Sequence, residues 1–192
     1  MLNKKWKTEI FTIPNLLSLF RLLLIPVYLF LYLHAEEPKQ YYMAGCILAV
    51  SCLTDAVDGK IARHFHMVST LGKILDPLAD KVTQLVLTIC LSMKYPVLNP
   101  VLAMFIVKEL FQTTLGIIYL RKGKMLPGAL AAGKISTAVL FISLTLLVFF
   151  PNLPAKLVKA IALTDSLFLL VSFISYYFAY FGSAKKLQDW GT

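Results

Sequence analysis

The sequence predicts an all-α polytopic membrane protein with six transmembrane helices and both termini in the cytoplasm. Hydrophobic residues fill 58% of the 192 positions and charged residues only 15%, whereas a typical soluble domain has about 25% charged residues. Six apolar segments each approach the roughly 20 residues that a helix needs to cross a bilayer. No linker or low-complexity segment interrupts them, so residues 1–192 are expected to form a single domain.

The predicted helices follow one another with short polar connections. They cover residues 13–33, 41–62, 72–94, 97–120, 133–150 and 156–181. Pro26 lies inside the first helix, where a membrane span tolerates a kink. The second helix ends and the third begins with acidic residues, the fourth contains Lys108 and Glu109, and the last contains Asp165 as a lone acidic residue.

Lysine and arginine predict the orientation, because cytoplasmic loops carry an excess of both. The richer side holds Lys4, Lys5, Lys7, Lys60, Arg63, Lys73, Arg121, Lys122, Lys124, Lys185 and Lys186. The other side holds Lys39, Lys94, Lys156 and Lys159. The termini and the connection between the second and third helices are therefore expected in the cytoplasm. The net charge of +9 comes from these basic loops. It favours binding of anionic lipid head groups or phosphate substrates and does not indicate binding of nucleic acid.

Four of the ten acidic residues lie in one short stretch around the connection between the second and third helices. Asp55 and Asp58 are three residues apart, and Asp76 and Asp80 are four apart. Both spacings place a pair on one face of a helix. Four carboxylates brought together by the helical hairpin would repel one another unless cations lie between them. Oxygen ligands favour hard cations such as Mg²⁺, Mn²⁺ or Ca²⁺ over zinc or copper.

Glycine and arginine near the aspartates indicate a phosphate ligand. Gly59 follows Asp58 directly and lets the backbone approach a ligand closely. Gly72 can do the same across the hairpin or can pack helix against helix. Arg63 lies one turn beyond Gly59, and its guanidinium suits a phosphate. Phosphoryl transfer requires groups that neutralise and align the phosphates, and metal ions, an arginine and a backbone that approaches the ligand closely can do both. A diphosphate is therefore the expected ligand.

The pattern Asp55-x-x-Asp58-Gly59-x-x-Ala62-Arg63, eight residues, Gly72-x-x-x-Asp76-x-x-x-Asp80 resembles the signature of the CDP-alcohol phosphotransferases. The opening IPNLLSLFRLLLIP is similar to that of the phosphatidylglycerophosphate and cardiolipin synthase branch. The resemblance implies a metal-dependent transfer of a phosphatidyl group from CDP-diacylglycerol to an alcohol, with release of CMP. It also implies a homodimer in the cell membrane, with an active site that faces the cytoplasm.

The resemblance further implies roles for single residues. Asp55, Asp58 and Asp76 would hold one divalent cation, Mg²⁺ or Mn²⁺. Asp55, Asp76 and Asp80 would hold a second, and Asp80 would also act as the general base. The residues implied to contact the CDP portion of the substrate are Gly59, Arg63, Ser69 and Gly72. His64 and His66 are interpreted as interfacial loop residues.

Two acceptor alcohols remain open. Candidate acceptor-binding residues are Lys108, Arg121, Lys122, Lys124 and Lys134, although the loop cations also serve the topology and Lys108 can pair with Glu109. Lys108-Glu109 resembles the Arg-Glu of the phosphatidylglycerophosphate synthases, which favours glycerol 3-phosphate as acceptor. Their second arginine is missing from residues 111–116, as in the cardiolipin synthases. Phosphatidylglycerol is therefore the alternative acceptor.

Two other classes of protein fit these residues less well. A membrane cation transporter would also place carboxylates in its helices, but nearer to mid-membrane and with symmetry between two halves. The sequence has no such repeat, and Gly59 and Arg63 have no obvious use in a cation pathway. An inactive scaffold with the same fold would not need the complete set of aspartates.

Overall fold

All regular structure in the described part of the chain is helical. The computed structural model describes residues 13–64, 72–121 and 130–188, although the side chains of 13, 14, 38, 55–64, 72–74, 120 and 182–188 lie outside the description. The helices are α2 (Ile13–Leu33), α3 (Pro38–His64), α4 (Gly72–Lys94), the 3-10 turn η1 (Pro96–Leu98), α5 (Asn99–Arg121), α6 (Ala131–Phe149) and α7 (Ala155–Gln188). Each predicted segment therefore corresponds to one α-helix.

Four of the described helical regions are long and apolar enough to cross a membrane. They are Asn15–Leu33, Pro96–Tyr119, Ala131–Phe149 and Ala155–Phe181. Large apolar side chains such as Leu23, Phe30 and Phe178 are more than 60% exposed. A soluble protein avoids so much exposed apolar surface, whereas lipid solvates it. The helices therefore belong to a multi-pass membrane protein.

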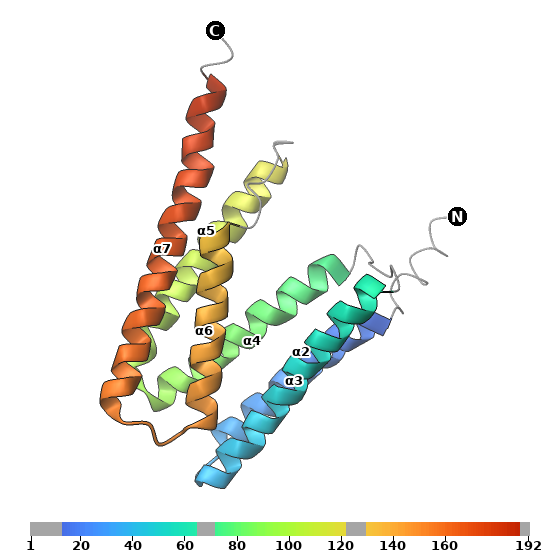
Figure 1. Cartoon of the computed structure of the whole chain (residues 1–192), viewed down its shortest axis with the longest axis vertical. Coiled ribbons are helices and arrows are strands. Elements are labelled where there is room, and N and C mark those ends of the chain that lie inside the picture. Colours follow the sequence, from blue (N-terminus) through green and yellow to red (C-terminus); the bar gives the residue numbers. More distant parts are fainter. Residues whose placement is uncertain (1–12, 65–71, 122–129, 189–192) are drawn as a thin grey trace. The chain divides into compact units, whose positions relative to one another are not determined.

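The helices gather into two compact units. The first contains α2, α3, α4 up to Cys90, and residues 148–151. In this unit α2 and α3 form an antiparallel hairpin and pack along their length (Figure 1). Ile25, Tyr28 and Tyr32 of α2 and Ala44 and Leu48 of α3 contribute buried side chains to its core. This hairpin is the framework against which α4 presents its aspartates.

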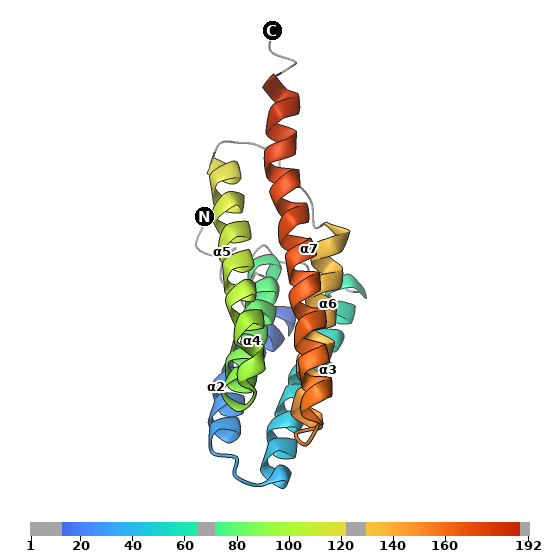
Figure 2. The ribbon, with the colours of Figure 1, turned by 90° about the vertical axis from the view of Figure 1, so that its left-hand side faces the viewer.

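The second unit contains the end of α4, η1, α5, α6 up to Leu147, and α7. Helices α5 and α7 run side by side in the same direction (Figure 2). Phe111 packs against Phe173 with ring centroids 4.8 Å apart. Nearer the ends of the helices, the Tyr119 hydroxyl donates a hydrogen bond to the Tyr180 carbonyl oxygen. These contacts fix the register between α5 and α7.

Gly133 allows the start of α6 to approach α7 closely. A Cβ atom at this position would lie 2.6 Å from Oη and 2.7 Å from Cε2 of Tyr176, a buried side chain. We therefore expect Gly133→Ala to destabilise the protein by about 1–3 kcal/mol through overpacking. Thermal unfolding in detergent measures this effect. Helix propensity alone would make the same change stabilising, so a raised Tm would contradict the packing argument.

Candidate active site

Two of the predicted metal ligands, Asp76 and Asp80, lie one turn apart near the start of α4. Their side chains are 45% and 51% exposed, respectively. Further along the same helix, Gln84 and Thr88 continue the polar face at four-residue spacing and are buried. Helix α4 therefore presents a polar ridge whose outer end carries two accessible carboxylates.

Helix α2 holds both carboxylates from the buried side. Arg21 Nη1 donates a hydrogen bond to Asp80 Oδ1 at 2.7 Å, and Arg21 Nη2 lies 3.9 Å from Asp76 Oδ1. The Ser18 hydroxyl donates a hydrogen bond to the same Asp76 oxygen. Arg21 is 3% exposed and Ser18 is fully buried. One guanidinium therefore draws two carboxylates together, and about half of each remains accessible.

The chemistry of this pair fits a hard divalent cation. The two carboxylates converge on one positive group, and all their donor atoms are oxygens, which Mg²⁺ and Mn²⁺ prefer. Among the described residues, no group of three or more His, Cys, Asp or Glu side chains is placed to hold a metal. The side chains of Asp55 and Asp58 are not among them, so the four-aspartate cluster stays a prediction.

Several other predicted site residues belong to α3 and α4, but their side chains are not described. Asp55, Asp58, Gly59, Arg63 and His64 belong to the last turns of α3, and their side chains lie outside the described residues. Gly72 is the first residue of α4. Ser69 and His66 lie outside the described residues altogether. Each pair of aspartates thus lies on a helix as predicted, at the two ends that the connection joins.

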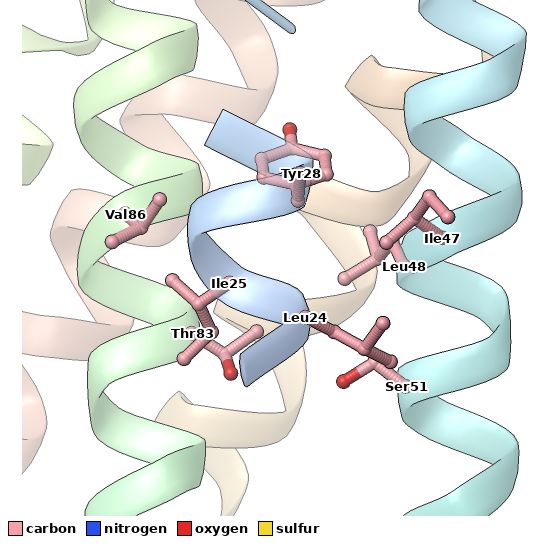
Figure 3. A pocket seen from close by; sticks show the side chains of 8 residues that line it. All are labelled: Leu24, Ile25, Tyr28, Ile47, Leu48, Ser51, Thr83 and Val86. Atoms are coloured by element: carbon pink, nitrogen blue, oxygen red, sulfur yellow. The ribbon is translucent and has the colours of Figure 1, made fainter. Parts of the chain in front are cut away.

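An apolar pocket lies next to the carboxylates, between α2, α3 and α4 (Figure 3). Its lining residues are Leu24, Ile25, Tyr28, Ile47, Leu48, Ser51, Thr83 and Val86. Thr83 follows Asp80 by one turn of α4, and Leu24 follows Arg21 by one turn of α2. The polar cluster of α2 and α4 therefore passes into the apolar interior of this unit within one helical turn.

The candidate acceptor residues lie in the second unit. Lys108 is 4% exposed, and its Nζ lies 2.7 Å from Oε1 of Glu109, which confirms the predicted internal pair. Arg121, the last residue of α5, and Lys134, near the start of α6, are exposed. Lys122 and Lys124 lie outside the described residues. The exposed cations are available to an anionic ligand, whereas Lys108 already has a carboxylate partner.

Comparison with known proteins decides the family. The sequence model for CDP-alcohol phosphatidyltransferase matches residues 11–178 of the chain. The chain belongs to the CDP-alcohol phosphatidyltransferase family. It is therefore an enzyme, and its apolar helices agree with the membrane location of a transferase in phospholipid biosynthesis.

Relatives of this phosphatidyltransferase carry two different names. The CDP-diacylglycerol–glycerol-3-phosphate 3-phosphatidyltransferase of Aquifex aeolicus is 34% identical over 172 residues, which cover 85% of this chain and 93% of that one. A cardiolipin synthase of Streptomyces coelicolor is 43% identical over 75 residues, 38% of this chain and 35% of that one. A cardiolipin synthase–hydrolase fusion of Schizosaccharomyces pombe is 43% identical over 88 residues, 46% of this chain but only 14% of that one.

Ser18 and Arg21 have no role in the predicted site, although both belong to the N-terminal segment that resembles the family. A signal was present, because Asn15, Ser18 and Arg21 recur every three residues within an apolar span. Such spacing places three polar side chains on one helix face, and all three are buried. An ionisable residue inside a membrane helix is by default a candidate for function.

Proposed function

We propose that this enzyme transfers the phosphatidyl group of CDP-diacylglycerol to glycerol 3-phosphate, giving phosphatidylglycerophosphate and CMP. The observation that carries the proposal is the pair of half-exposed carboxylates, Asp76 and Asp80, held at the start of α4. They occupy the last two positions of a motif that is complete in this chain. The exposed apolar side chains of α2 support a substrate whose lipid tails stay in the bilayer.

The site residues are proposed to act as a set. Asp55, Asp58 and Asp76 hold one divalent cation, and Asp55, Asp76 and Asp80 hold another. When bound, two Mg²⁺ or Mn²⁺ ions would neutralise the negative charge of the diphosphate. The residues proposed to contact the CDP portion are Gly59, Arg63, Ser69 and Gly72. Asp55 and Asp58 follow the pocket residue Ser51 by four and seven positions on α3, a spacing that supports their part in the set.

Asp80 is proposed to act as the general base. Its carboxylate accepts the proton of the acceptor hydroxyl while that oxygen attacks the phosphorus that bears diacylglycerol. A new phosphorus–oxygen bond forms, the bond to the cytidine-bearing phosphate breaks, and CMP leaves with the bonding electrons. The half-exposed position of Asp80 supports this role, because the base must reach a substrate that arrives from outside the helix bundle.

The proposed topology has six spans, with both termini and the site on the cytoplasmic side. Helices α3 and α4 complete the set of six, and their aspartate-bearing ends are joined by the short segment 65–71. The positive charges of the flanking loops support this orientation. The single domain over residues 1–192 and the homodimer implied by the resemblance stay predictions.

Glycerol 3-phosphate is favoured as acceptor because the match to the Aquifex aeolicus enzyme covers 85% of this chain, whereas those to the two cardiolipin synthases cover 46% and 38%. The exposed cations Arg121 and Lys134 support binding of its phosphate, and Lys108 is a third candidate. Phosphatidylglycerol is the second candidate acceptor, because residues 111–116 lack a cation.

The acceptor is tested with purified protein, CDP-diacylglycerol and Mg²⁺, offering each alcohol in a separate reaction. We expect CMP release about 10- to 100-fold faster with glycerol 3-phosphate than with phosphatidylglycerol, since the exposed cations Arg121 and Lys134 can form charge-assisted hydrogen bonds with a doubly charged phosphomonoester, whereas phosphatidylglycerol offers only a singly charged phosphodiester. A reaction without acceptor measures background hydrolysis. Turnover with phosphatidylglycerol alone would instead make the enzyme a cardiolipin synthase, and cation flux without CMP release would favour a transporter.

A further inference from the structure

Helix α2 carries a buried polar face directed toward the carboxylates of α4. Arg21 is 3% exposed, although its helix is one of the four apolar regions able to cross a membrane. An arginine in such surroundings is costly unless it is paired with an opposite charge. Its Nη1 lies 2.7 Å from Oδ1 of Asp80, and its Nη2 lies 3.9 Å from Oδ1 of Asp76. The cost of burying Arg21 is thus offset by the two residues proposed to bind metal.

The exposure of the three side chains is unequal. Arg21 lies on the inner side, whereas the side chains of Asp76 and Asp80 are 45% and 51% exposed. A cation or substrate that approaches from the exposed side meets the carboxylates first. The guanidinium can therefore support them from behind without occupying the space that a ligand needs.

We propose that Arg21 is a positioning residue that orients Asp80 for proton transfer, and that Ser18 orients Asp76 in the same way. This inference rests on the proposed function, since it gives Asp80 the role of base. Arg21 engages Oδ1 of Asp80, and a carboxylate has a second oxygen, Oδ2, which we assign as the atom that accepts the proton. A base held within hydrogen-bond reach of its substrate reacts faster than one that samples several rotamers.

Arginine is required here because of its shape as well as its charge. Its two terminal nitrogens reach two different carboxylates at once, Nη1 toward Asp80 and Nη2 toward Asp76. Lysine offers one nitrogen on a flexible stem and cannot reproduce this fork. We therefore expect Arg21→Lys to keep the charge but only part of the orientation.

Cation binding separates a positioning role from a merely structural one. The charge of Arg21 repels cations that bind to Asp76 and Asp80. If Arg21 only orients the carboxylates, Arg21→Gln leaves Mn²⁺ binding unchanged or tighter while catalysis slows. If Arg21 instead holds the site together, its loss weakens Mn²⁺ binding and catalysis together.

The experiment measures Mn²⁺ binding by electron paramagnetic resonance, kcat, and KM for CDP-diacylglycerol on the full-length protein. We expect Arg21→Gln to lower kcat about 10- to 100-fold, as the loss of partners behind metal ligands typically does, with KM and Mn²⁺ affinity preserved. Arg21→Lys should have an intermediate kcat. The control is Lys39→Gln, which removes one exposed positive charge elsewhere and should leave all three quantities unchanged.

Three results would overturn the proposal. Unchanged kcat in Arg21→Gln would show that Arg21 has no part in positioning Asp80. Weaker Mn²⁺ binding together with a lowered Tm would show that Arg21 is a structural residue. A raised KM at constant kcat would make Arg21 a contact of the substrate. Failure of the proposed function can be distinguished from failure of the positioning role. In the first case the unsubstituted enzyme would release no CMP. Weaker Mn²⁺ binding by Arg21→Gln would contradict the positioning role in either case.

Discussion

Asp80→Asn is expected to lower kcat for CMP release by about 10³-fold or more, since a positioned general base contributes roughly 10²- to 10⁴-fold. Asparagine keeps the size of the side chain but cannot accept the hydroxyl proton, and it is a weaker cation ligand. It also leaves the buried Arg21 without the carboxylate that lies 2.7 Å away. Initial rates with CDP-diacylglycerol, glycerol 3-phosphate and Mg²⁺ measure this loss.

Glu37→Gln is the matched control for this substitution. Glu37 is an exposed carboxylate in the connection between α2 and α3, next to the end of α3 that does not carry the aspartates. The loss of a negative charge at this position should leave kcat near its original value, because Glu37 has no place in the proposed site. Size-exclusion profiles of both variants check folding. CMP release that persists at the original rate in Asp80→Asn would exclude Asp80 as the base.

The positions of the helices followed well from hydropathy, because every span consists of an apolar run bounded by polar connections. Predicted residues 13–33 and 72–94 coincide with α2 and α4. Helix α7 continues to Gln188, beyond the predicted end at 181. The extension contains Ala184, Lys185 and Leu187, which favour helix. Hydropathy shows only where the apolar run ends, so it does not detect a helix that continues into polar residues. Helix α3 begins earlier than predicted, at Pro38, a residue suited to the first turn of a helix.

The site was only partly accessible to sequence reasoning. The spacing of Asp76 and Asp80 placed them on one face of a helix, and their carboxylates do converge on one partner. That partner, Arg21, is separated from Asp80 by 59 positions, and no local period connects α2 with α4. Lys108 illustrates the converse, because its pairing with the adjacent Glu109 could be predicted from the sequence. Contacts within a helix can be predicted from the spacing of residues along the chain, whereas contacts between helices can be predicted only once the packing of the helices is known.

Removal of divalent cations is expected to reduce CMP release to background, a loss of at least about 10²-fold, since a metal-bound diphosphate loses several kcal/mol of charge stabilisation without its ions. Asp76 and Asp80 remain half-exposed even while Arg21 contacts both, so their outer sides are open to added ions. Chelation followed by titration with Mg²⁺ or Mn²⁺ should restore the rate. Zinc should restore it poorly, because it prefers nitrogen and sulfur ligands.

Two measurements distinguish a catalytic requirement for metal from a requirement for stability. Circular dichroism should show the same helical content before and after chelation, because Arg21 and Ser18 hold Asp76 and Asp80 through contacts between side chains. Mn²⁺ titration should give two bound ions per chain, and Asp76→Asn should weaken both, since Asp76 is proposed as a ligand to each. Full activity after chelation would exclude a metal-dependent reaction. A single bound ion that restores the full rate would reduce the proposed site to one metal.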